Sequence, residues 1–159
     1  MRDRRLFDAI LANDLVLISM LLSQNVDIRT AFIHGVEEIR PLSLAAQIGS
    51  LEIVKILVEE GANVDSTNEW GSTALFYALE ANHFDIADYL LEEGADIDVS
   101  AGSCPPIIAS VVSCNLNVTR YLVEHGANVN ERDATGRDAL DYAKLKGEDD
   151  TIAYLANIT

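Results

Sequence analysis

The stretch Gly61-Ala62-Asn63-Val64-Asp65 decides the fold, because closely similar stretches return at nearly constant spacing. The next is Gly94-Ala95-Asp96-Ile97-Asp98, 33 residues later, and then Gly126-Ala127-Asn128-Val129-Asn130, after 32 more. An apolar pair such as Leu57-Val58 stands four and three positions before each glycine. Self-similarity at a fixed period of this length is typical of proteins built from stacked structural repeats.

Two further copies are in phase with these three. Asn25-Val26-Asp27-Ile28 follows Leu21-Leu22 as a degraded first copy, and Leu140 opens a copy that ends near Leu155. We therefore predict that the 159 residues form one domain of five units, the first and last acting as end caps. The predicted units span about 1–29, 35–67, 68–99, 100–132 and 133–159.

Each unit is predicted to contain two short helices. In the second unit, Pro41 suits a first helical turn and Gly49 suits the left-handed residue that closes a helix. The next helix, Ser50 to Val58, has apolar residues at 53, 54, 57 and 58, which fits the 3.6-residue period, and Gly61 ends it.

Where such a glycine is missing, another residue must adopt the left-handed conformation. Asn13, Asn25 and Asn82 stand at these places, and asparagine is the next most suitable residue. Cys114 stands where a glycine is expected in the fourth unit. We expect Asn115 to adopt the left-handed conformation there instead.

This pattern resembles the ankyrin repeat family over essentially the whole chain. The family's opening Thr-Pro-Leu-His-x-Ala-Ala is similar to Arg40-Pro41-Leu42-Ser43-Leu44-Ala45-Ala46, and its Asp-x-x-Gly turn is similar to Asn68-Glu69-Trp70-Gly71. The resemblance implies an all-α solenoid of stacked helix-turn-helix units with short β-hairpin-like fingers. The chain departs from the pattern around 30–39, where the finger should be longer or irregular, and at 103–107, where a doubled proline disfavours a regular hairpin.

Charge restricts the classes of partner. The chain has 11 Lys+Arg against 26 Asp+Glu, a net charge of −15. Nucleic acids and anionic membranes are bound through basic residues, so neither is expected as a partner. A basic partner is favoured by long-range attraction; alternatively, the acid simply keeps a monomer soluble. The longest apolar run near the N-terminus, Leu15 to Leu22, is too short for a membrane span, and no signal peptide is indicated.

Side chains that could carry chemistry follow no known pattern. The three histidines, His34, His83 and His125, are not at metal-ligand spacing, and neither a nucleophile elbow nor a phosphate-binding loop is present. Cys104 and Cys114 form no disulfide framework and are predicted to be buried or half-buried thiols in a reducing, cytoplasmic setting. We therefore expect a protein that is not an enzyme and that needs no metal or cofactor.

The resemblance implies that partners bind the concave surface formed by the finger tips and the first helix of each unit. Trp70 is either a binding contact on an exposed turn or folds back over Ile39 or Pro41. Phe76 replaces the family's usual histidine, so the hydrogen bonding there must differ. The predicted partner-binding residues are Val36, Glu37, Ile39, Gln47, Ile48, Glu69, Trp70, Ser72, Glu80, Ala81, Val112, Ser113 and Arg137.

The predicted function is non-enzymatic binding of a protein, basic in charge, through this concave surface. One alternative is a dedicated inhibitor or immunity-type protein that neutralises a basic enzyme such as a nuclease; another is an accessory subunit of an enzyme, or an enzyme itself. A monomer is expected. Because Val16 would face solvent in an isolated chain, a dimer contact through the N-terminal repeat is the alternative.

Overall fold

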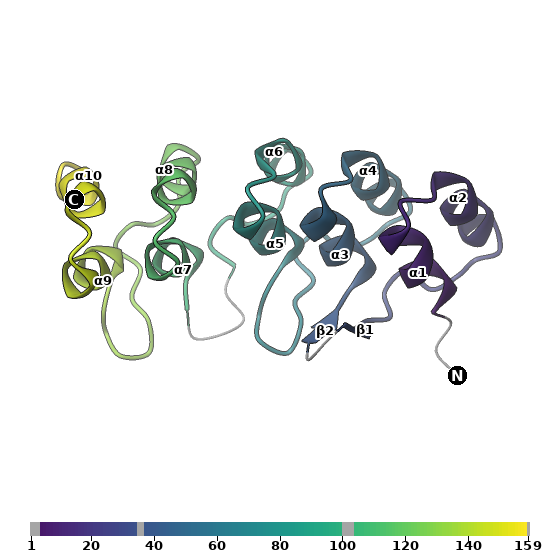
Figure 1. Ribbon diagram of the computed structural model, residues 1–159, viewed down its shortest axis with the longest axis horizontal. Helices are drawn as coiled ribbons and strands as arrows, with labels where there is room; N and C mark the ends of the chain where they lie inside the picture. The colour runs from purple at the N-terminus through teal and green to yellow at the C-terminus, as the bar shows by residue number, and fades with distance from the viewer. Residues whose placement is uncertain (1–3, 35–36, 100–103, 159) are drawn as a thin grey trace. The chain divides into compact units, whose positions relative to one another are not determined.

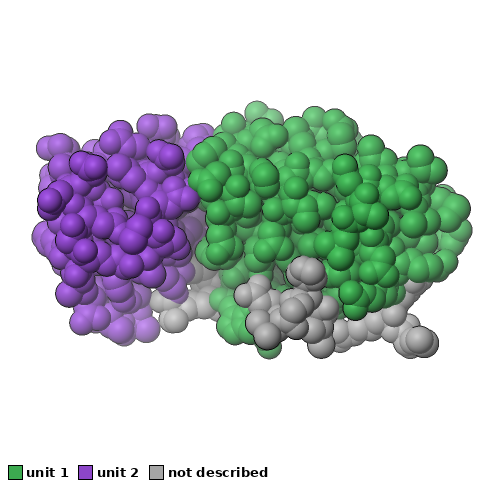
Figure 2. Space-filling view, in the orientation of Figure 1, with its two compact units in different colours: residues 1–95 green, residues 96–159 purple. Residues whose placement is uncertain are grey.

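A computed structural model describes residues 4–34, 37–99 and 104–158 of the chain. The chain divides into two compact units, residues 1–95 and 96–159 (Figure 2). The single five-repeat domain stays a prediction. Within the described ranges, no helix is both long and apolar enough to cross a bilayer.

The first unit contains three helix pairs and one β-hairpin. In Figure 1 the first helices of the pairs form one row and the second helices another, with the hairpin beyond the first row. Helix α3 packs against both α1 and α5, so the first row is the spine of this unit. The elements are α1 (Arg5–Leu11), α2 (Leu15–Ser23), β1 (Phe32–His34), β2 (Glu37–Ile39), α3 (Pro41–Ile48), α4 (Leu51–Glu59), α5 (Ala74–Glu80) and α6 (Phe84–Glu92).

The second unit contains two helix pairs, and its first helices also pack together. Its elements are α7 (Pro106–Val112), α8 (Leu116–Glu124), α9 (Ala139–Lys146) and α10 (Asp149–Ala156). The described residues thus hold ten helices in five pairs and a single two-stranded sheet. This confirms the predicted all-α fold class.

The helix ends explain why the pairs form where they do. Pro41 opens α3, and Gly49 closes it in the left-handed conformation at a φ of 80°. Asn13, Asn25 and Asn82 have φ values of 53°, 56° and 60°, which confirms the asparagine substitution. Each of these residues ends one helix and turns the chain into the next segment.

The prediction for the fourth repeat was wrong. Cys114 itself adopts the left-handed conformation, with a φ of 54°. Asn115 has a φ of −106° and instead begins α8, where its side-chain oxygen accepts a hydrogen bond from the Val118 N–H at 3.2 Å. Asn115 stabilises the chain more as the N-cap of α8 than it would as a left-handed residue, because the first N–H groups of a helix need hydrogen-bond acceptors.

Small side chains let the first helices approach closely. Ala45, Ala78 and Ala143 are fully buried at equivalent places in α3, α5 and α9. Ser110 takes this place in α7, and its hydroxyl is satisfied by Thr119 Oγ1 at 2.8 Å. The repeat register therefore places either a methyl group or a paired hydroxyl at each contact.

The irregular segment before α3 forms an antiparallel hairpin, in which Phe32 pairs with Ile39. Residues directly opposite each other in such a pair lie on the same face of the sheet. That face is buried: Phe32 is 6% exposed, Ile39 is 2% exposed, and the Phe32 ring lies 5.5 Å from that of Phe7. Ile39 is therefore a core residue, and its predicted role in partner binding is wrong.

The two cysteines also differ from the prediction. Cys104 and Cys114 are both exposed free thiols rather than buried or half-buried ones. Cys114 is exposed because it sits on the tight turn between α7 and α8. Of the doubled-proline opening of the fourth repeat, only Ser103 lies outside the described residues. Pro105 is the N-cap residue of α7, and Pro106 begins that helix.

Candidate protein-interaction surface

The turn from Asn68 to Ser72 places Trp70 at its tip. The Asn68 side-chain oxygen accepts hydrogen bonds from the N–H groups of Trp70 at 3.0 Å and Ser72 at 2.9 Å. The Gly71 N–H donates to the Asn68 carbonyl at 3.1 Å, and Gly71 has a φ of 82°. The turn is therefore held by one side chain and by a glycine in a conformation that other residues rarely adopt.

A second bond fixes this turn to the helix that follows it. Asn68 Nδ2 donates to the hydroxyl of Tyr77 at 3.0 Å, and Tyr77 lies in α5 with only 3% of its surface exposed. The turn is thus attached to a core residue. Trp70 is 50% exposed, so half of its surface remains open on a preorganised support.

The last turns of the first helices provide the second part of the surface. Gln47 and Ile48 at the end of α3 occupy the same repeat positions as Glu80 and Ala81 at the end of α5. Ile48 and Glu80 are exposed, and Gln47 and Ala81 are half-buried. Because α3 and α5 pack side by side, these two helix ends are neighbours in the first unit.

In the second unit the same positions are also open to solvent. Val112 is 41% exposed, and Ser113 and Arg137 are exposed. Arg137 lines a shallow, open hollow with Asp141, Lys144 and Leu145. The turn residue Arg137 thus lies next to three side chains of α9.

The structure does not place every predicted site residue on a surface. Ser72 is half-buried and Glu69 is exposed beside Trp70. Val36 lies outside the described residues. Glu37 lies in β2, but its side chain is outside the described part. Ile39 is removed from the set because it is buried.

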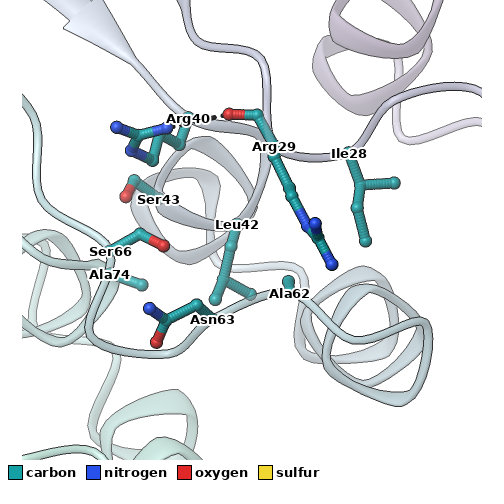
Figure 3. A pocket seen from close by; sticks show the side chains of 9 residues that line it. All are labelled: Ile28, Arg29, Arg40, Leu42, Ser43, Ala62, Asn63, Ser66 and Ala74. Carbon is teal, nitrogen blue, oxygen red and sulfur yellow. Dashed lines mark hydrogen bonds between the residues drawn. The ribbon is translucent and has the colours of Figure 1, made fainter.

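The cavity shown in Figure 3 is not a candidate ligand pocket. It has a volume of about 10 Å³, which is room for about one water molecule. Arg40 closes it by donating to the carbonyls of Arg29 at 2.8 Å and Thr67 at 3.0 Å. Among the residues that the structure describes, no group of three His, Cys, Asp or Glu side chains could hold a metal ion.

Comparison with known proteins decides the family. A family model described as ankyrin repeats (3 copies) matches residues 6–101, and one described as ankyrin repeats (many copies) matches residues 107–155. The chain belongs to the ankyrin repeat family. Ankyrin repeats form protein–protein interaction modules, typically without enzymatic activity.

Several relatives carry the ankyrin repeats within much longer chains. An ankyrin repeat protein of Acanthamoeba polyphaga mimivirus is 29% identical over 96% of this chain and 20% of its own length. Human ankyrin repeat and SOCS box protein 11 is 32% identical over 67% of this chain and 33% of its own length. Human transient receptor potential cation channel subfamily A member 1 is 32% identical over 63% of this chain and 12% of its own length. The chain thus spans about a third or less of each of these relatives.

The ankyrin register also identifies two surface residues that our sequence analysis missed. Leu11 in α1 and Leu145 in α9 occupy the repeat position held by Gln47, Glu80 and Val112. They are 42% and 66% exposed. Counting back 36 residues from Gln47 and forward 33 from Val112 would have found them, because both lie in phase.

Proposed function

We propose that this ankyrin module binds a basic protein partner through the finger tips and the ends of its first helices, with Trp70 as the central contact. The supporting observation is a half-exposed tryptophan on a turn that Asn68 fixes to the core residue Tyr77. Tryptophan is enriched among the residues that dominate binding energy. A support that is already ordered loses little conformational entropy on association.

Charge around Trp70 favours the basic class of partner. Glu69 and Glu80 are exposed, and no basic side chain in the described ranges forms an ion pair with either. Both carboxylates are therefore available to a cationic side chain. The net charge of −15 adds long-range attraction, which raises the association rate and weakens as salt is added.

The apolar side chains of the surface add a second requirement for the partner besides charge. Ile48 and Trp70 are 38% and 50% exposed in the same unit that carries Glu69 and Glu80. An interface needs a desolvated apolar centre surrounded by polar contacts. The proposed partner therefore presents apolar side chains next to Lys or Arg.

A dedicated inhibitor of a basic enzyme such as a nuclease is the second candidate function, and the net charge of −15 on a small chain favours it. An inhibitor binds one partner tightly, whereas an adaptor binds more modestly, so the measured affinity separates the two. The proposed setting is the cytoplasm, because two exposed free thiols suit a reducing compartment.

Affinity capture at low and high salt, with the captured proteins identified by mass, tests the proposal. We compare the wild-type chain with Glu80→Lys and with Glu92→Lys, which makes the same charge change at an exposed position in the second-helix row. Glu80→Lys should lose the salt-sensitive partner, and Glu92→Lys should retain it. Equal loss with both variants would show that only net charge matters and would overturn the proposed surface.

A further inference from the structure

One side of helix α2 is exposed and uncharged, with three apolar side chains and two serines. Leu15, Val16, Ser19, Met20 and Ser23 follow one another around this side at the 3.6-residue period, and all five are exposed. We call these five residues the outer face of α2. The opposite side carries Ile18 and Leu21, which are fully buried.

The outer face of α2 differs from the same face of every other second helix. Val16 is 82% exposed at the position held by Glu52, Asp85, Asn117 and Asp150 in the other repeats. Helix α2 has no charged residue, whereas α4, α6, α8 and α10 each have at least two. An exposed, uncharged helix side of this kind is typical of an interaction site.

The two serines do not make this face polar. The Ser19 hydroxyl donates to the Leu15 carbonyl at 2.8 Å, and the Ser23 hydroxyl donates to the Met20 carbonyl at 2.7 Å. Both hydroxyl protons are therefore used within the helix. What remains facing outward is mainly carbon.

Charge identifies what can bind there. Residues 1–29 contain four arginines and four aspartates and no other charged residue, so their net charge is zero. The whole net charge of −15 therefore arises in residues 30–159, from 7 Lys+Arg and 22 Asp+Glu. A basic partner gains nothing at the outer face of α2, whereas two copies of this acidic chain can meet there without strong local repulsion.

We propose that the outer face of α2 binds the same face of a second copy of this chain, related by a two-fold axis. A two-fold interface uses one surface patch on both copies. An uncharged patch within a segment of zero net charge does not repel the same patch on a second copy. At physiological salt, charges farther than about 8 Å are largely screened, so the acidic repeats contribute little repulsion. This interface goes beyond the proposed function, because it uses the second-helix row rather than the first-helix row and the fingers (Figure 1).

The size of the patch sets the expected strength. A helix of nine residues is about 14 Å long, so a pair of such helices buries less than the roughly 1,200 Å² of a standard stable interface. The dimer is therefore weak and concentration-dependent, as is typical of interfaces below the standard size.

Sedimentation velocity of the full chain from about 10 µM to 1 mM tests this inference. The wild type should shift from monomer to dimer over that range. Val16→Glu, which installs the residue type found at Glu52, should weaken association at least 10-fold, and Val16→Lys should do the same. Ile158→Glu is the matched control: it adds one carboxylate at another exposed apolar residue, 43% exposed, and should leave the dimer unchanged.

Salt and cross-linking provide independent measurements. Added salt should leave this dimer unchanged or strengthen it, opposite to the effect on a basic partner. A Ser19→Cys chain, with Cys104→Ser and Cys114→Ser, should form a disulfide-linked dimer under mild oxidation, because Ser19 lies at the middle of α2. A chain that stays monomeric at 1 mM, or dimers that Val16→Glu leaves intact while circular dichroism shows native helix content, would overturn the proposal.

Discussion

Two turns of this chain, Asn68 to Ser72 in the first unit and Asp133 to Arg137 in the second, have the same construction and different tips. In each, the first side chain accepts hydrogen bonds from the N–H groups two and four residues later. Each turn contains a glycine at positive φ, 82° at Gly71 and 79° at Gly136. Each is also hydrogen-bonded to a tyrosine nine residues after its first residue.

The chemistry of the first residue separates the two turns. Asn68 is neutral and donates to Tyr77, whereas the Asp133 carboxylate accepts from the Tyr142 hydroxyl at 2.6 Å and from the Thr135 hydroxyl at 2.7 Å. These hydrogen bonds hold the pKa of Asp133 well below its ordinary value. The second turn is therefore stabilised by charge.

The residues at the tips of the two turns differ in what their side chains contact. Trp70 leaves half of its surface open, while Thr135 at the same position turns its hydroxyl back onto Asp133. The tip residue of the first turn is thus open for a binding contact, whereas the tip residue of the second turn stabilises that turn. The repeat keeps the turn backbone constant and lets the tip change.

Replacing the turn glycines should have the largest effect on stability. In Gly71→Val and Gly136→Val, a β-branched residue is forced to a positive φ, which costs about 3 kcal/mol. Gly136 has open space around the position of a β-carbon, so its cost is backbone strain alone, whereas Gly71 is buried and should lose more. Thermal unfolding measures both; an unchanged Tm for either would show that its turn does not need the left-handed glycine.

Truncating the two tips should separate binding from stability. Trp70→Ala should weaken partner binding by about 2 kcal/mol, roughly 30-fold, with little change in Tm, because the turn backbone does not depend on the indole. Thr135→Ala should lower Tm slightly and leave binding unchanged. Titration calorimetry with the captured partner measures the first effect, and equal affinities for wild type and Trp70→Ala would remove Trp70 from the surface.

Removing the tyrosine hydroxyls compares the two attachments. Tyr77→Phe breaks a neutral hydrogen bond and should cost about 1 kcal/mol. Tyr142→Phe breaks a shorter bond to a carboxylate and should cost more, since charge-assisted bonds are the stronger class. Urea unfolding gives both free energies; if Tyr77→Phe proved the more costly, charge would not be what distinguishes the turns.

The stabilisation by the Asp133 carboxylate should depend on pH. Since the pKa of Asp133 is lower in the folded than in the unfolded chain, its stabilisation is present above the ordinary pKa of 3.8 and is lost as pH falls further. Asp133→Asn should therefore lower Tm at pH 7 and make it less sensitive to acid below about pH 4. Asn68→Asp should do the reverse, and parallel pH profiles for wild type and Asp133→Asn would contradict the assignment.

Most of the fold could be predicted because each helix end is marked by its own residue. Pro41, Gly49 and the asparagines act locally, so their conformations follow from the sequence. The left-handed conformation of Cys114 could not be predicted, because Asn115 was suited both to that conformation and to the N-cap of α8. In the structure Asn115 is the N-cap. The strain of cysteine at a positive φ is offset by the N-cap hydrogen bond of its neighbour Asn115. The propensities of single residues do not include this compensation.

The candidate site was less predictable, because exposure depends on pairing across the chain. Ile39 looks like a surface residue, but it pairs with Phe32, whose ring packs near Phe7, and it is buried. Leu11 and Leu145 were missed for a different reason: each is apolar, and only the repeat register shows that its position is an open one. Periodicity therefore predicts the elements, whereas hairpin pairing decides which apolar side chains remain at the surface.

Trp70 is the sole tryptophan of the chain. Intrinsic fluorescence excited at the indole therefore reports on one turn and nothing else. A ligand that covers this ring would shift its emission to shorter wavelength without any label, and a ligand seated elsewhere would leave the spectrum unchanged. Trp70 is thus an intrinsic fluorescent probe at the position that we propose as the central contact with the partner.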